Sequence, residues 1–147
     1  MSETSERMET PAPAGHELVD HTSEVTMRIH APTFSALVAE ATTGFAELVP
    51  EALRGEASQG LRDFRIQARD RVAALVEWLN EIVYLCEADQ WLPTRVDVTG
   101  GGGDDLRIRA RGVALSAPFV LVKAATLHGA FVRQGTDGLE AEVTLDV

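Results

Sequence analysis

The chain has 147 residues, of which 45% are hydrophobic and 24% charged, so it suits one globular domain and is too short for two ordinary ones. Its formal net charge of −10 would repel a phosphate backbone, which disfavours tight direct binding of nucleic acid. No apolar run reaches the roughly 20 residues that a membrane helix needs, and the N-terminus lacks the features of a secretory signal, so we expect a cytoplasmic protein.

The first third of the chain predicts a tail, two strands and a helix. Residues 1–14 are rich in Ser, Thr, Glu and Pro, and we expect a disordered tail ahead of one domain over residues 15–147. A first strand is predicted from about His16, which we expect on the strand surface. Residues 25–30 alternate apolar and polar side chains, as a half-buried strand does. Apolar residues at three-and-four spacing then predict a helix over residues 34–48.

The middle of the chain contains the clearest helical pattern. Residues 51–60 are polar and predict a loop, and residues 61–66 indicate a short strand. Residues 69–88 predict a long helix with a wide apolar stripe. Cys86 belongs to this stripe, so we expect a small buried core residue rather than a reactive thiol. As the only cysteine, it leaves no partner for an intramolecular disulfide.

The last part of the chain reads as strands. Residues 91–98 and 106–110 predict a hairpin, joined by a mobile turn with four consecutive glycines. Two more strands are predicted over residues 121–132 and 139–147. The whole pattern predicts an α+β domain, with two helices packed on one side of a mostly antiparallel β-sheet in two layers.

Acidic residues interrupt the strand pattern near both ends of the chain. A hard divalent cation such as Ca²⁺ or Mg²⁺ prefers oxygen ligands. Asp20 and Glu24 could supply such oxygens at one end, and Asp146 with the carboxyl group of Val147 could supply them at the other. In a protein with 23 acidic residues, composition alone favours the simpler interpretation, in which these groups are solvated strand ends.

No strong catalytic signature is present. His21 and His128 could be ligands or hydrogen-bond partners, but no pair of histidines has the spacing of a zinc motif, and no serine sits in a nucleophile elbow. Lys123 is the only lysine among 13 basic residues. Strand parity places it on the opposite face from Thr126 and His128, so a Lys–His pair is not expected unless Gly129 marks a bulge. We expect Lys123 to neutralise the acidic cluster, to contact a partner, or to be an ordinary exposed lysine.

Three blocks of sequence, in order, resemble the archease family. They are LVDHTSEV at residues 18–25, LVEWLNEIVYL at 75–85, and VKAATLHG at 122–129, the last followed by a terminal LDV. Together they span almost the whole predicted domain. The resemblance implies a small α+β cytoplasmic protein that is not itself an enzyme. It also implies activation of an RNA-splicing ligase, by promoting guanylylation and multiple turnover in tRNA splicing or RNA repair.

The resemblance also implies a divalent cation, often Ca²⁺, at an acidic site. By position, the metal-binding residues of the family fall on Glu24, Asp146 and Val147. Secondary candidates near the site or the partner surface are Asp20, His21, Lys123 and His128. The family usually has Ala and Asp where this chain has Ser23 and Glu24, so the carboxylate is kept on a side chain longer by one methylene.

Two other classes of function stay open. A metal-dependent hydrolase could use the same acidic cluster, with His21 or His128 as a proton carrier, and would be active in isolation. A general chaperone or adaptor could hold a merely structural cation, and would assist unrelated client proteins.

Overall fold

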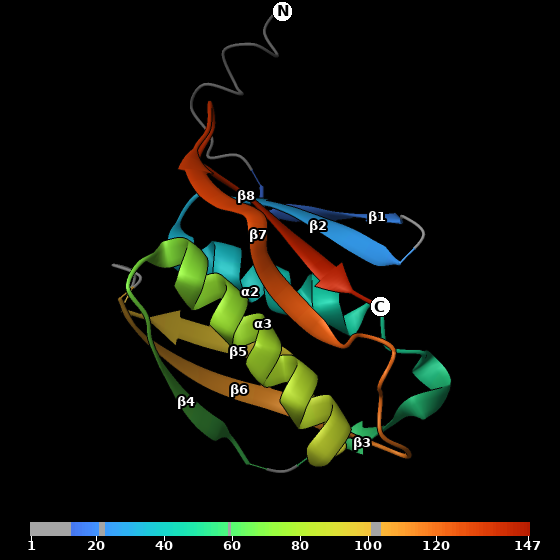
Figure 1. Ribbon diagram of the computed structural model, residues 1–147. Coiled ribbons are helices and arrows are strands. Elements are labelled where there is room, and N and C mark those ends of the chain that lie inside the picture. Colours follow the sequence, from blue (N-terminus) through green and yellow to red (C-terminus); the bar gives the residue numbers. More distant parts are fainter. Residues whose placement is uncertain (1–12, 21–22, 59, 101–103) are drawn as a thin grey trace, which may run out of the picture.

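The structure is a computed structural model that describes residues 13–20, 23–58, 60–100 and 104–147 (Figure 1). Most of the predicted tail and part of the glycine-rich turn lie outside these residues. The strands are β1 (Gly15–Asp20), β2 (Glu24–Ala31), β3 (Arg54–Ala57), β4 (Arg62–Gln67), β5 (Trp91–Thr99), β6 (Asp105–Leu115), β7 (Ala124–Gln134) and β8 (Leu139–Asp146). The helices are α2 (Phe34–Ala46), α3 (Arg71–Ala88) and a 3₁₀ turn at Glu51–Leu53.

The strands form two antiparallel sheets. Sheet A has the order β1-β2-β8-β7. In sheet B, β6 is central, with β5 on one edge and with β4 and β3 on successive parts of the other. The predicted α+β class with two helices and antiparallel strands is therefore confirmed. The division of the strands between two sheets was not indicated by the sequence, because alternation reveals a buried face but not which strands pair.

Both helices lie between the two sheets (Figure 1). Helix α2 packs against β1 and β2 of sheet A and against β5 of sheet B, and α3 packs against β7 and against β4 and β5. The largest side chains that are almost fully buried include Trp78, Phe45, Met27, Leu75 and Leu145, which come from both helices and from sheet A. Neither helix combines the length and hydrophobicity that a bilayer crossing needs, within the part of the chain that is described.

The two helices begin at side-chain caps. Thr33 accepts a hydrogen bond from the Ala36 N–H at 3.2 Å, and Asp70 accepts one from the Ala73 N–H at 2.9 Å. Each cap satisfies a backbone donor that the first turn leaves free. Cys86 is fully buried on α3, as predicted, and burial raises the pKa of its thiol to about 12. The thiol therefore stays protonated and unreactive near neutral pH.

Two sequence predictions were wrong. Residues 51–60 do not form only a loop, because Arg54–Ala57 is a strand, β3, that pairs with the end of β6. This strand is short and mostly exposed, so it has no hydrophobic alternation to reveal it. The weaker strand predicted at 61–66 is confirmed as β4.

The second error concerns His16, which is not a simple surface residue. Its Nδ1 lies 2.5 Å from a carboxylate oxygen of Glu40, and its Nε2 lies 2.6 Å from one of Glu47, both on or just after α2. Burial of the ring disfavours its charge, but the hydrogen bonds and the attraction of the two glutamates outweigh this, and the pKa of His16 is raised. His16 therefore ties β1 to α2.

Candidate functional site

The two acidic ends of the chain meet in sheet A. Glu24, the first residue of β2, lies directly opposite Asp146, the last residue of β8, and Asp146 lies opposite Ala124 on β7. Directly opposite residues of an antiparallel pair project from the same face. Both acidic residues are exposed. The register thus places two carboxylates together on the outer face of sheet A, at one end of the sheet.

Backbone hydrogen bonds place two more of the predicted residues at the end of sheet A where Glu24 and Asp146 lie. The Val147 N–H donates to the Ser23 carbonyl at 3.2 Å, and the Lys123 N–H donates to the Asp146 carbonyl at 2.8 Å. Lys123 is exposed and Val147 is half-buried. The structure therefore brings together Glu24, Asp146, Val147 and Lys123.

The remaining predicted residues are placed less fully. Asp20 lies opposite Val25, the residue that follows Glu24 on β2. The side chain of Asp20 is outside what the structure describes. His21 is also outside the described residues. Any role for Asp20 or His21 in binding a cation therefore remains a prediction.

A bulge in β7 carries His128. The register passes from Thr126 opposite Thr144 directly to Phe131 opposite Glu142, so residues 127–130 have no partner on β8. Gly129 has a positive φ of 72°, a conformation that a side chain would disfavour. A Lys123–His128 pair was not expected unless Gly129 marked a bulge, and the structure has this bulge. No hydrogen bond or ion pair among the described residues joins His128 to Lys123.

The bulge presents polar and apolar groups to solvent. The His128 N–H donates to Oγ1 of Thr126 at 3.1 Å, which fixes the start of the bulge. The Leu127 side chain next to it is 45% exposed, and His128 is exposed as well. The bulge thus places an exposed leucine next to an exposed histidine at the edge of sheet A.

Three threonines form the next row behind the carboxylates. Thr26 on β2 lies opposite Thr144 on β8, which in turn lies opposite Thr126 on β7. Thr26 is 7% exposed. These threonines were not among the residues predicted from the sequence. The signal was available, because each lies two positions along its strand from Glu24, Asp146 or Ala124, and such residues share a face.

Helix α3 fixes the end of β7 through Asn80. The Asn80 amide donates to the Ala125 carbonyl at 3.0 Å and accepts from the Ala125 N–H at 2.8 Å. An edge strand exposes backbone groups of this kind, and the side chain satisfies both of them. Ala125 adjoins Ala124, the residue opposite Asp146, so Asn80 positions the site from the helix. A lone asparagine within an apolar helical stripe was the signal for this role.

The charge balance of the outer face of sheet A singles out the Glu24–Asp146 pair. Elsewhere on this face, Arg28 lies 3.8 Å from Glu17 and 3.7 Å from Glu142, and Arg133 lies 3.2 Å from Glu140. No ion pair among the described residues includes Glu24 or Asp146. Like charges directly opposite one another destabilise a sheet. A bound cation would therefore relieve a repulsion that the protein leaves uncompensated.

The donor set suits a hard cation better than a soft one. Within the described residues, no group of three or more His, Cys, Asp or Glu side chains is arranged to hold a metal. The available ligands are the two carboxylates and main-chain oxygens, with threonine hydroxyls one row behind. Oxygen-only ligands favour Ca²⁺ or Mg²⁺ over zinc, with water or a partner completing the coordination.

Comparison with known proteins gives a family match over nearly the whole described chain. The model of the Archease protein family (MTH1598/TM1083) matches residues 16–147. Protein archease of Archaeoglobus fulgidus is 26% identical over 136 residues, which cover 90% of this chain and 98% of that protein. Protein archease of Methanosarcina barkeri is 24% identical over 140 residues, covering 90% and 95%.

Two solved structures share the fold. The solution structure of Methanobacterium thermoautotrophicum protein 1598 is 21% identical, with a TM-score of 0.65, and the match covers 90% of this chain and 99% of that one. The crystal structure of an archease from Thermotoga maritima, described as a possible chaperone, is 18% identical, with a TM-score of 0.62 and coverage of 89% and 96%. The arrangement of two helices between two antiparallel sheets is therefore shared with these proteins.

Proposed function

The chain belongs to the archease family, and from that premise we propose that it is a non-enzymatic protein cofactor that activates an RNA-splicing ligase. In this proposal it promotes guanylylation and multiple turnover of the ligase, in tRNA splicing or RNA repair. A divalent cation, Ca²⁺ or Mg²⁺, binds at the end of sheet A. The relative from Thermotoga maritima is described as a possible chaperone, which accords with action on a protein partner.

The observation that carries the proposal is the uncompensated pair of Glu24 and Asp146. Their register places both carboxylates on one exposed face, and no arginine of that face pairs with either. In the proposal, these carboxylates and a main-chain oxygen of Val147 hold the cation, and water or the partner supplies further ligands. The bound cation supplies positive charge and open coordination positions toward the partner.

Lys123 and the β7 bulge have separate roles in the proposal. The Lys123 backbone bonds to Asp146 while its side chain is exposed, so its ammonium group is available for an anionic group of the partner. Leu127 and His128 provide the neighbouring contact surface. Asn80 positions both features, because it fixes Ala125 between them.

The charge of the whole chain supports action on a protein rather than on free RNA. At a net charge of −10, the protein is attracted to a basic RNA-binding enzyme, and complementary potentials raise the association rate. This attraction is screened by salt. We therefore expect the amount of protein needed for half-maximal stimulation to rise with ionic strength.

The test is ligation by the cognate ligase, measured in single and multiple turnover, with and without this protein, over a range of Ca²⁺ and Mg²⁺ concentrations. Covalent transfer of GMP to the ligase is measured in parallel. The site variant is Glu24→Gln with Asp146→Asn. The matched control is Glu17→Gln with Glu142→Gln, which removes the same charge from the same face but from the row that Arg28 neutralises.

We expect the site variant to lose stimulation of multiple turnover and the control to retain it. A folded site variant that stimulates as well as the unchanged protein would contradict the proposal. Hydrolysis of phosphoesters by the isolated protein would favour the metal-dependent hydrolase. Protection of unrelated aggregating proteins, without any effect on ligation, would favour a general chaperone with a structural cation.

A further inference from the structure

The outer face of sheet B is rich in arginine, although the chain as a whole is strongly acidic. The inward side chains of β6, Leu106, Ile108 and Ala110, are at most 1% exposed, and the residues between them point to solvent. We call the outward residues of the three long strands of this sheet the arginine face. Its members are Asp63, Arg65 and Gln67 on β4, Arg95, Asp97 and Thr99 on β5, and Asp105, Arg107, Arg109 and Arg111 on β6.

The register of sheet B sets arginines directly opposite one another. Arg65 lies opposite Arg107, and Arg95 lies opposite Arg111. Like charges in these positions destabilise a sheet. Five of the residues on this face are arginines and three are aspartates, so the face has an excess of positive charge. It therefore differs in sign from the rest of this acidic protein.

The aspartates neutralise only part of this charge. The Arg109 Nε lies 2.8 Å from an Asp63 oxygen, and Arg65 makes two bonds with Asp105, at 2.9 and 3.1 Å. The hydrogen bonds from Arg65 hold the pKa of Asp105 below its ordinary value, with Arg107 adding a smaller attraction. No ion pair among the described residues includes Arg95, Arg107 or Arg111.

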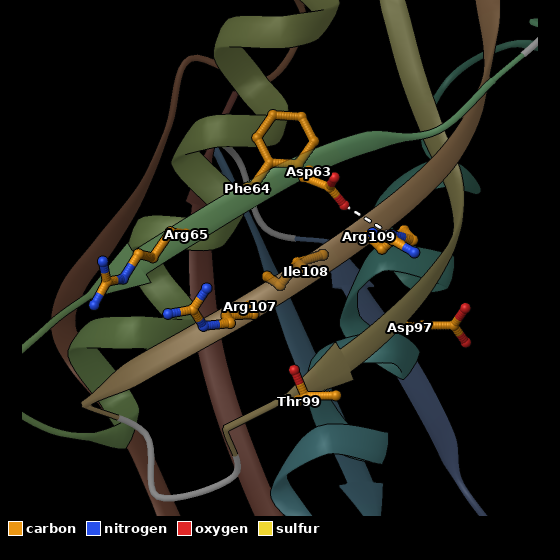
Figure 2. A pocket seen from close by; sticks show the side chains of 8 residues that line it. All are labelled: Asp63, Phe64, Arg65, Asp97, Thr99, Arg107, Ile108 and Arg109. Atoms are coloured by element: carbon orange, nitrogen blue, oxygen red, sulfur yellow. Dashed lines mark hydrogen bonds and ion pairs between the residues drawn. The ribbon is translucent and has the colours of Figure 1, made fainter.

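The central part of the face is hollowed. A depression of about 510 Å³ is lined by residues of all three strands (Figure 2). Arg65, Arg107, Arg109 and Thr99 line it, together with Asp63, Asp97, Phe64 and Ile108. Figure 2 also shows the contact between Asp63 and Arg109. Arg109 lies between Arg107 and Arg111 along β6, so this contact falls between the two arginine pairs. Three guanidinium groups and two carboxylates line the hollow, so it keeps an excess of positive charge for an anion.

We propose that the arginine face binds the sugar–phosphate backbone of a single-stranded RNA. Side chains two positions apart on a strand are separated by about 6.6 Å, so Arg107 and Arg111 lie about 13 Å apart along β6. This is close to two steps between phosphates along an extended strand. One phosphate would lie at the Arg65–Arg107 pair and another at the Arg95–Arg111 pair, and each would relieve a like-charge contact.

The chemistry of the face predicts contact with the backbone rather than with bases. The residues that define the face include no aromatic ring. Phe64 also lines the hollow, but its ring packs against that of Trp78, 5.3 Å away, which is fully buried. Stacking platforms for bases are therefore absent from this face. Binding should be independent of sequence, and weak because of the net charge of −10.

This inference rests on the proposed function, which favours RNA over an acidic protein as the ligand of the arginine face. In that function the protein binds an enzyme whose substrate is RNA, so an RNA strand is an anion close at hand. The cation site is on sheet A and the arginine face is on sheet B, with both helices between them (Figure 1). One protein could thus contact the ligase through sheet A and the RNA strand through sheet B.

The test is the fluorescence anisotropy of a labelled oligouridylate RNA titrated with the full-length protein at several low salt concentrations. The variant Arg107→Gln with Arg111→Gln removes one arginine from each pair. The matched control, Arg28→Gln with Arg133→Gln, changes the net charge equally on sheet A. A charge-preserving variant, Arg107→Lys with Arg111→Lys, and thermal melting of every variant show whether lost binding is due to lost charge or to unfolding.

We expect the unchanged protein and the control to bind RNA and the glutamine variant to lose affinity. The slope of log affinity against log salt should fall in magnitude by about 0.7 for each of the two phosphate contacts removed. The lysine variant should keep most of this slope. Absence of binding at low salt, equal loss in the control, or competition by polyglutamate as strong as by RNA would each overturn the proposal. No ligase is present in this assay, so its result is independent of the Glu24–Asp146 experiment.

Discussion

Glu24 and Asp146 lie directly opposite each other on β2 and β8, and no arginine among the described residues forms an ion pair with either. This arrangement predicts opposite effects of Asp146→Asn with and without a cation. In the presence of a chelator, the substitution should raise the free energy of unfolding by about 0.2–1 kcal/mol, because it removes a like-charge pair. It should also abolish the rise in melting temperature that we expect Ca²⁺ to give the unchanged protein. Thermal unfolding with EDTA and with Ca²⁺ measures both effects.

The control for this prediction is Asp137→Asn in the turn between β7 and β8, which removes an exposed charge far from Glu24 along β8. It should respond to Ca²⁺ as the unchanged protein does. Equal stabilisation of Asp146→Asn by Ca²⁺ would show that the cation does not bind at this pair.

Asn80 is predicted to be a structural link between α3 and the site. Asn80→Ala leaves the N–H and the carbonyl of Ala125 without their side-chain partner, and should lower the free energy of unfolding by about 1–3 kcal/mol. Glu77→Ala, at an exposed position of the same helix, is the control and should change it by less than about 0.5 kcal/mol. Urea denaturation gives both values, and equal effects of the two substitutions would refute the assignment.

His16 is predicted to make the stability of the protein depend on pH. The pKa of its imidazole is raised above the ordinary 6.5 in the folded state. The stabilisation of the folded protein by His16 is therefore fully present below pH 6.5, where the ring is charged in both the folded and the unfolded state. It is lost as the pH rises through the raised pKa of the folded state. The difference in unfolding free energy between the unchanged protein and His16→Gln should shrink over that range.

Two measurements check the role of His16. Urea denaturation at several pH values gives the difference in free energy, and NMR titration of the imidazole gives its pKa in the folded protein. A difference that stays constant with pH, or a folded pKa at or below 6.5, would contradict the tie between His16 and the glutamates Glu40 and Glu47.

The opposed arginines of sheet B predict a stabilising substitution. Arg111→Glu replaces a like-charge pair with an attractive pair to Arg95, and should raise the free energy of unfolding by about 0.5 kcal/mol at low salt. The gain should diminish as salt is added, because both side chains are exposed. Denaturation at low and high salt tests this, and a loss of stability at low salt would contradict the register-based explanation.

Local patterns predicted many of the elements correctly. The three-and-four spacing of apolar residues identified both helices, with ends within about three residues of the observed ones. Strict alternation identified β2 and β8, and the turn residues identified the hairpin of β5 and β6. The strand β3 was missed because residues 54–57 have no pattern of their own that indicates a strand. They form one because β6 extends far enough to pair with them.

The sequence by itself determined the helices, the inward faces of β2 and β8, the buried state of Cys86 and the acidic residues of the candidate site. These features depend on local periodicity and on residue chemistry, which a single chain displays directly. The tertiary structure alone decided that Glu24 faces Asp146, that His16 binds two glutamates, that Asn80 holds Ala125, and that arginines oppose one another on sheet B. Each of these depends on register and packing between distant segments, and a pattern with a period of two residues specifies a face without specifying its partner.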